Sequence, residues 1–149
     1  MNLSQHLTLN ECIKSNTATR LGISNMPSED HLQNLKDVAE HVFEPIRERF
    51  RVPIGISSGY RSPRLNKAVK GSLTSDHCKG MALDLDAEIF GGLTNAEIFH
   101  FIKDNLEFKH LIWEFGDDNE PAWVHVSFDK NNNMKKVLKT LKGGGYANY

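Results

Sequence analysis

The sequence has few cysteines, almost no net charge and no secretory signal. Its two cysteines, Cys12 and Cys78, lie far apart and outside any CxxC motif, which excludes a disulfide framework. The 18 basic and 19 acidic residues leave a formal net charge of −1, so no overall field attracts nucleic acid or an anionic membrane. We therefore expect neither as a partner, and individual residues must bind any charged substrate.

Long apolar runs, repeats and low-complexity linkers are also missing. No stretch approaches the roughly 18 apolar residues that cross a membrane, and MNLSQHLTLNECIKS has no basic segment followed by an apolar run. We therefore expect synthesis in the cytoplasm, with delivery by another component if the target lies outside. The length of 149 residues, with 39% hydrophobic and 25% charged, predicts one globular domain over residues 1–149, in which only the tail, residues 143–149, is loose. We expect a monomer.

Helix signals occur in four segments. Capping boxes at Thr8–Glu11 and Thr94–Glu97 each open a helix, and Ser62 with Pro63 starts a short one that runs to about Val69. The longest segment, from Ser28 to Phe50, has apolar residues at helical spacing, and Pro45 should disturb its hydrogen bonding.

Strand signals follow the first helices. Alternating or apolar runs predict strands at Pro53–Ser58, Met81–Asp86, Leu111–Phe115 and Trp123–Phe128, with a final edge strand over Met134–Leu141. The loop between the third and fourth runs is rich in turn formers and predicts a hairpin. This order favours an α+β domain with a central, mainly antiparallel sheet and helices packed on one side.

Three residues with metal-ligand chemistry lie on or near two of these strands. Asp84 shares a strand face with Ala82 and Asp86, and His125 lies mid-strand on the more polar face of its own strand. His77 precedes the Asp84 strand in a loop that reaches the same face. Two histidines and a carboxylate form a typical catalytic zinc set with one open position. The spacing alone leaves open a packed core histidine and a loop-capping aspartate.

Three stretches together are similar to a known family. The stretches SGYRSPRLN, SDHCKGMALDLD and WVHVSF resemble the zinc D-alanyl-D-alanine carboxypeptidases, a family that includes L-alanyl-D-glutamate endopeptidases and phage endolysins. The resemblance runs from about Leu3 to Phe128. It implies the Hedgehog/DD-peptidase fold, with one Zn²⁺ held by His77, Asp84 and His125. Between the first two ligands, a glycine at position 80 allows a tight turn.

Arg61 follows the first predicted strand and is the candidate for binding a substrate carboxylate. A guanidinium presents a bidentate fork that matches a carboxylate. The resemblance implies that the arginine of this turn holds the free carboxylate of a peptidoglycan stem peptide, and Ser75 of the metal motif is assigned to the same substrate site. The alternative is a surface arginine that pairs with an acidic neighbour.

The general base departs from the family pattern. Many members have a glutamate three residues before the last ligand histidine, where this chain has Ala122. Glu114, on the strand paired with that of His125, and Glu120, in the loop, are the two candidates. We favour Glu114 because a strand fixes its position. Asp86 is either a partner of a ligand histidine or a strand-end carboxylate.

These residues together predict a zinc metallopeptidase that hydrolyses a peptide bond of the stem peptide. The reaction is that of a D-alanyl-D-alanine carboxypeptidase or of an L-alanyl-D-glutamate endopeptidase. A phage-type lysin, released to the cell wall by a separate pore, fits the missing signal. The alternative is a non-catalytic zinc-containing binding or structural module, such as a phage tail component.

Overall fold

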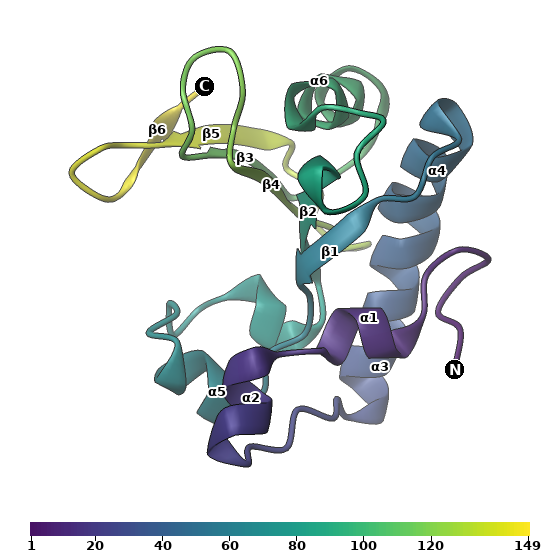
Figure 1. Ribbon diagram of the computed structural model, residues 1–149, viewed down its shortest axis with the longest axis vertical. Coiled ribbons are helices and arrows are strands. Elements are labelled where there is room, and N and C mark those ends of the chain that lie inside the picture. Colours follow the sequence, from purple (N-terminus) through teal and green to yellow (C-terminus); the bar gives the residue numbers. More distant parts are fainter.

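A six-stranded sheet organises the structure, a computed structural model that describes residues 1–149. The strands lie in the order β1-β2-β4-β3-β5-β6 (Figure 1). Their bounds are Gly55–Ser58 (β1), Ala82–Asp86 (β2), His110–Glu114 (β3), Trp123–Ser127 (β4), Lys136–Thr140 (β5) and Tyr146–Asn148 (β6).

All neighbouring strands pair antiparallel except β3 and β5, which pair parallel. The predicted hairpin is the β3–β4 pair, and the prediction of a mainly antiparallel sheet is confirmed. Two details of the prediction were wrong. The segment expected to be the last edge strand is β5, an inner strand, and the tail expected to be loose contributes the true edge strand β6.

The helices are short apart from two. Their bounds are Leu9–Ile13 (α1), Asn16–Leu21 (α2), Glu29–Val38 (α3), Glu44–Phe50 (α4), Pro63–Ala68 (α5) and Asn95–Asn105 (α6), with a π-helix at Ala39–Phe43 (η1) and 3₁₀ turns at Asp76–Lys79 (η2) and Ala87–Ile89 (η3). Both predicted capping boxes are present. No helix has the length and apolar character needed to cross a membrane.

The long predicted helix is continuous through α3, η1 and α4, with a π-helical turn in its middle. The N–H of Glu44 donates to the carbonyl of Ala39, five residues earlier. Pro45 has no N–H to donate and its ring excludes the normal α-helical carbonyl position. The chain accommodates the proline by widening the turn that precedes it, as the sequence predicted.

One face of the sheet is apolar and covered by helices. Alternate residues of β2, β3 and β4 point to this face and are almost fully buried against α3, η1, α4 and α6: Leu83, Leu85, Leu111, Trp113, Val124 and Val126. In Figure 1, α6 and the α3–α4 helix lie on the same side of the strands, whereas α2 and α5 lie below them. This packing confirms the α+β fold and leaves the other face free for polar side chains.

Candidate metal centre

The polar face of the sheet brings two of the predicted ligands into register. Asp84 on β2 pairs directly with His125 on β4, and His125 pairs in turn with Ile112 on β3. Side chains that are directly opposite on adjacent strands project to the same face. The carboxylate of Asp84 and the imidazole of His125 therefore meet, with Asp84 Oδ1 lying 3.0 Å from His125 Nδ1.

His77 reaches the same point from a 3₁₀ turn, η2, where the sequence predicted a loop. Ser75 caps the turn, since its hydroxyl oxygen accepts a hydrogen bond from the His77 N–H. Gly80 ends the turn with φ of 73°, and a Cβ there would lie 2.3 Å from the carbonyl oxygen of His31. Only glycine adopts this conformation in so little space, which confirms the predicted tight turn between the first two ligands.

The geometry of the three side chains suits zinc. One ligand atom from each of His77, Asp84 and His125 can be chosen so that all lie within 4.8 Å of one another. His77 Nε2 is 3.3 Å from Asp84 Oδ1. A catalytic zinc site uses three nitrogen or oxygen ligands and keeps one position open. Two imidazoles and one carboxylate at this separation fit that requirement.

A backbone carbonyl fixes the orientation of the His77 ring. His77 is 2% exposed, and its Nδ1 lies 2.6 Å from the carbonyl oxygen of Gly59. A carbonyl only accepts, so Nδ1 donates to it and Nε2 is the ring nitrogen that faces the centre. Gly59 is itself held against α1, because a Cβ there would come within 2.4 Å of the Cys12 carbonyl oxygen.

The charge state of Asp84 also favours a cation. Burial acts to raise its pKa, but the nearby His77 and His125 outweigh burial and hold the pKa of this carboxyl well below its usual range. Asp84 is therefore a largely buried anion between two imidazoles. A buried carboxylate is retained only where it is paired or binds metal.

A buried ion pair that the sequence did not predict supports η2. Lys109 Nζ lies 2.8 Å from Asp76 Oδ1, and His110 Nδ1 lies 3.5 Å from the other carboxylate oxygen. Burial acts to raise the pKa of Asp76, but Lys109 and His110 together outweigh burial and lower it. Asp76 immediately precedes His77, so the pair ties the ligand-bearing turn to the start of β3. No local pattern links residues this far apart in the sequence.

Glu114 lies on the same face as the predicted ligands, two residues beyond Ile112 on β3. It is 6% exposed and lines one cavity of about 740 Å³ together with His77, Asp84 and His125. Burial raises the pKa of the Glu114 carboxyl to about 7, which His125 opposes and the charge of Asp84 reinforces. A carboxyl poised near neutral pH has the property of a general base.

The rival carboxylate, Glu120, has a different partner. Its Oε1 accepts a hydrogen bond of 2.6 Å from the backbone N–H of Ala96, at the first turn of α6. Asp86 likewise accepts from the Glu88 N–H and from the amide of Asn95. It is therefore a strand-end carboxylate and contacts no ligand histidine. Of the two glutamates, the structure brings only Glu114 into the wall of the metal cavity.

Arg61 borders the same cavity. Its backbone N–H donates to the His77 carbonyl, and its Nη2 lies 3.4 Å from the hydroxyl of Ser75. No carboxylate lies within 4.0 Å of its guanidinium, and its buried Nε has no hydrogen-bond partner. The structure therefore shows no acidic partner of the kind that the alternative reading of Arg61 requires.

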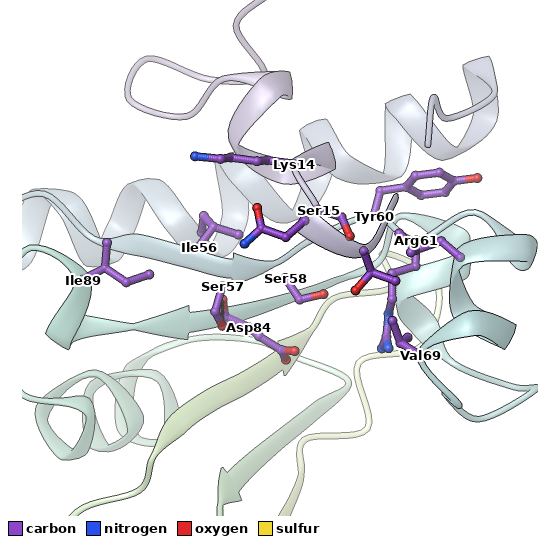
Figure 2. A pocket seen from close by; sticks show the side chains of 13 residues that line it. Lys14, Ser15, Ile56, Ser57, Ser58, Tyr60, Arg61, Val69, Asp84 and Ile89 are labelled. Carbon is purple, nitrogen blue, oxygen red and sulfur yellow. Dashed lines mark hydrogen bonds between the residues drawn. The ribbon is translucent and has the colours of Figure 1, made fainter. Parts of the chain in front are cut away.

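A second cavity of about 510 Å³ continues from the centre along β1. Asp84 and Arg61 line both cavities, and the second one reaches Lys14 and Ile89. In Figure 2, the side chains of Asp84 and Arg61 point towards a common space, whereas the Tyr60 ring points away from it. The predicted ligands thus lie along an elongated groove.

The comparison with protein families gives one match. The family model of peptidase M15 matches residues 5–127. No curated protein matches the chain. The matched region contains the three predicted ligands, Arg61 and both candidate bases, and it ends before β5 and β6. It also covers well over half of the chain. The chain therefore belongs to the peptidase M15 family, a family of zinc-dependent peptidases.

Proposed function

We propose that this protein is a zinc-dependent peptidase that hydrolyses a peptide bond in the stem peptide of peptidoglycan. One observation carries the proposal: His77, Asp84 and His125 meet on the same sheet face as Glu114, in a cavity that Arg61 also borders. Two imidazoles, an ionised carboxylate, a carboxyl with raised pKa and an unpaired guanidinium together provide what a peptidase for acidic peptides requires.

In the proposed reaction, the metal activates water and the scissile carbonyl, and Glu114 transfers the proton. Zinc, when bound, polarises the scissile carbonyl and lowers the pKa of water to about 7. Glu114 takes a proton from the attacking water and delivers it to the leaving amine, a role that needs a base with a pKa near neutrality. Burial already raises the pKa of Glu114 to about 7. Its strand keeps the carboxylate at a fixed place beside the predicted ligands.

Arg61 recognises the substrate. Its guanidinium has no carboxylate partner in the protein, so it is free to bind a carboxylate of the stem peptide through two parallel hydrogen bonds. The hydroxyl of Ser75, 3.4 Å from Nη2, restricts the orientation of the guanidinium. The groove that extends along β1 accommodates an extended peptide. We propose this role for Arg61 with Ser75 as its support.

The biological setting is proposed on the same basis. A monomer of this kind, made in the cytoplasm and released by a phage-type pore, would reach the cell wall as a lysin. D-Alanyl-D-alanine carboxypeptidase and L-alanyl-D-glutamate endopeptidase activity both fit the groove. Glu114 weighs against a non-catalytic zinc-binding module, because a structural site gains nothing from a buried carboxyl that is no ligand.

The direct test is digestion of purified peptidoglycan by the zinc-loaded protein, with the new termini identified by mass spectrometry. We expect a single class of new amino and carboxyl termini within the stem peptide. The Glu114→Gln variant, treated identically, should release none above background. A zinc-loaded protein that releases no new termini from walls of several stem-peptide types would contradict the proposal.

A further inference from the structure

We propose that the last strand, β6, completes the substrate site, and that the Tyr146 hydroxyl donates a hydrogen bond to the bound peptide. The inference rests on the proposed function and adds a residue to the same site. Tyr146 lies beyond residues 5–127, the part that matches the family model. The family match therefore assigns nothing to this strand.

Strand register places Tyr146 on the metal face of the sheet. Ile112, which pairs with His125, also pairs with Leu138 on β5, so Leu138 projects to that face. Thr140, two residues further along, shares the orientation of Leu138. Tyr146 pairs with Thr140 across the β5–β6 hairpin. The side chain of Tyr146 therefore projects to the same face as the predicted ligands.

The cavity around the metal centre includes this side chain. Tyr146 lines it together with Glu114 and Arg61, and 56% of the tyrosine remains exposed. Its hydroxyl makes no hydrogen bond within the protein. Burial, followed by the charges of Glu114 and Asp84, raises the pKa of the phenol and outweighs the opposing charge of Arg61. The hydroxyl is therefore protonated at neutral pH and is a donor without a partner.

The other face of β6 holds the strand in place. Tyr149 packs on the helix-covered side, with its ring centroid 4.8 Å from that of Phe99 and 5.8 Å from that of Trp113. Its backbone N–H donates to the carbonyl of Val137. The strand is thus anchored by one tyrosine and presents the other to the cavity. The anchored backbone keeps Tyr146 beside the cavity, so no loop has to be ordered when a ligand binds.

The chemistry of a stem peptide fits the side of the cavity on which Tyr146 lies. Phe115 and Trp123 pack beside the cavity in a tilted arrangement with ring centroids 5.3 Å apart, so together with Tyr146 they give the groove an aromatic side. Arg61 lines the same cavity. An extended peptide with a carboxylate on Arg61 would present its backbone carbonyls to the aromatic side. The phenol of Tyr146 is a free donor there.

The test measures peptide binding with catalysis blocked. Zinc-loaded Glu114→Gln protein is titrated with a synthetic stem peptide, with and without Tyr146→Phe. A lost neutral hydrogen bond should raise the dissociation constant by about two- to tenfold. Tyr146→Ala, which also removes the ring, should raise it further. Tyr149→Phe is the matched control, because it removes a hydroxyl from the same strand on the opposite face.

Kinetics with Glu114 intact give the second measurement. Tyr146→Phe should raise KM by a similar factor with little change in kcat, zinc content or melting temperature, whereas Tyr149→Phe should leave all four near wild type. If the two substitutions had equal effects, the role of Tyr146 would be overturned. The same would follow if Tyr146→Phe had no effect in a protein that cleaves the peptide. Either result would leave the peptidase proposal standing. A wild-type protein that neither binds nor cleaves stem peptides would overturn both.

Discussion

The two faces of the sheet differ most sharply at neighbouring residues of β2. Asp84 points to the cavity, is held ionised by two imidazoles and lies within 3.3 Å of both. Leu85, the next residue, points the other way and is fully buried among the helices. Because successive side chains of a strand point to opposite faces, β2 contributes both to the metal-binding face and to the hydrophobic core.

The comparison separates what keeps the domain folded from what makes it active. The helix-covered face buries aliphatic and aromatic side chains, so it supplies hydrophobic stabilisation. The open face collects buried or half-buried titratable groups, which cost stability unless they have partners. Substitutions on the first face should change the free energy of unfolding, and substitutions on the second should change metal binding or turnover.

The largest expected effect is on turnover. Glu114→Gln keeps the size of the side chain and removes the base, so kcat should fall by about 10²–10⁴-fold. Zinc content should not change, because Glu114 is no ligand. Glu120→Gln is the control, and it should keep kcat near wild type while slightly lowering the melting temperature through a weaker cap on α6. The opposite ranking of the two variants would show that the loop supplies the base.

The next largest effect is a loss of stability when the helix-covered face is changed. Leu85→Ala should reduce the free energy of unfolding by about 2–5 kcal/mol, because it leaves a cavity in a core where Leu85 has no exposed surface. Chemical denaturation of the metal-free protein measures this loss. Zinc stoichiometry and kcat at low temperature should stay near wild type. A variant that loses zinc in proportion to stability would show that the two faces are not independent.

A smaller effect is expected for substrate recognition. Arg61→Lys keeps the charge and loses the fork, so KM for a carboxylate-bearing stem peptide should rise by about tenfold or more. Arg61→Ala should raise it further. A substrate analogue with that carboxylate amidated should be insensitive to both changes. Equal sensitivity of the two substrates would place the carboxylate elsewhere in the groove.

The last effect is a pH dependence of stability. Glu114 has a pKa of about 7 in the folded metal-free protein, above its ordinary 4.5, so the folded state binds this proton more tightly than the unfolded state. The stability that this proton provides is fully present below about pH 4.5 and is lost as the pH rises through about 7, by an amount on the order of 3 kcal/mol.

Comparison of wild type with Glu114→Gln isolates that contribution. The pKa of His110 is lowered, chiefly by burial, so this residue adds stability with rising pH and opposes the trend in both proteins. The difference between their unfolding free energies should therefore change between pH 4.5 and 7 and be constant outside that window. A difference that is constant throughout would mean that Glu114 is solvated in the folded state.

Local sequence patterns predicted the parts of the fold that depend on local physics. Capping boxes at Thr8 and Thr94, the disturbance before Pro45 and the alternation of β2 and β4 each arise from neighbours in the chain. The prediction that His77, Asp84 and His125 converge used the same alternation together with the family resemblance, and the structure brings their ligand atoms together.

The features that the sequence did not predict depend on contacts between residues far apart in the chain. The parallel register of β5 beside β3 and the pairing of β6 depend on partners that no local pattern names. The GGGYANY tail is rich in glycine, so it resembled a loose end, although Tyr149 anchors it on Trp113. The pair between Lys109 and Asp76 and the cap that Glu120 places on α6 are also long-range contacts.

The most direct test of the account is the zinc content of three proteins after zinc is added and excess removed. Wild type should hold about one zinc per chain, Asp84→Asn far less, and Leu85→Ala about one, because only the first of these neighbouring side chains reaches the metal. A wild type that holds no zinc, or an Asp84→Asn variant that holds as much as wild type, would contradict the assignment of this face as the metal centre.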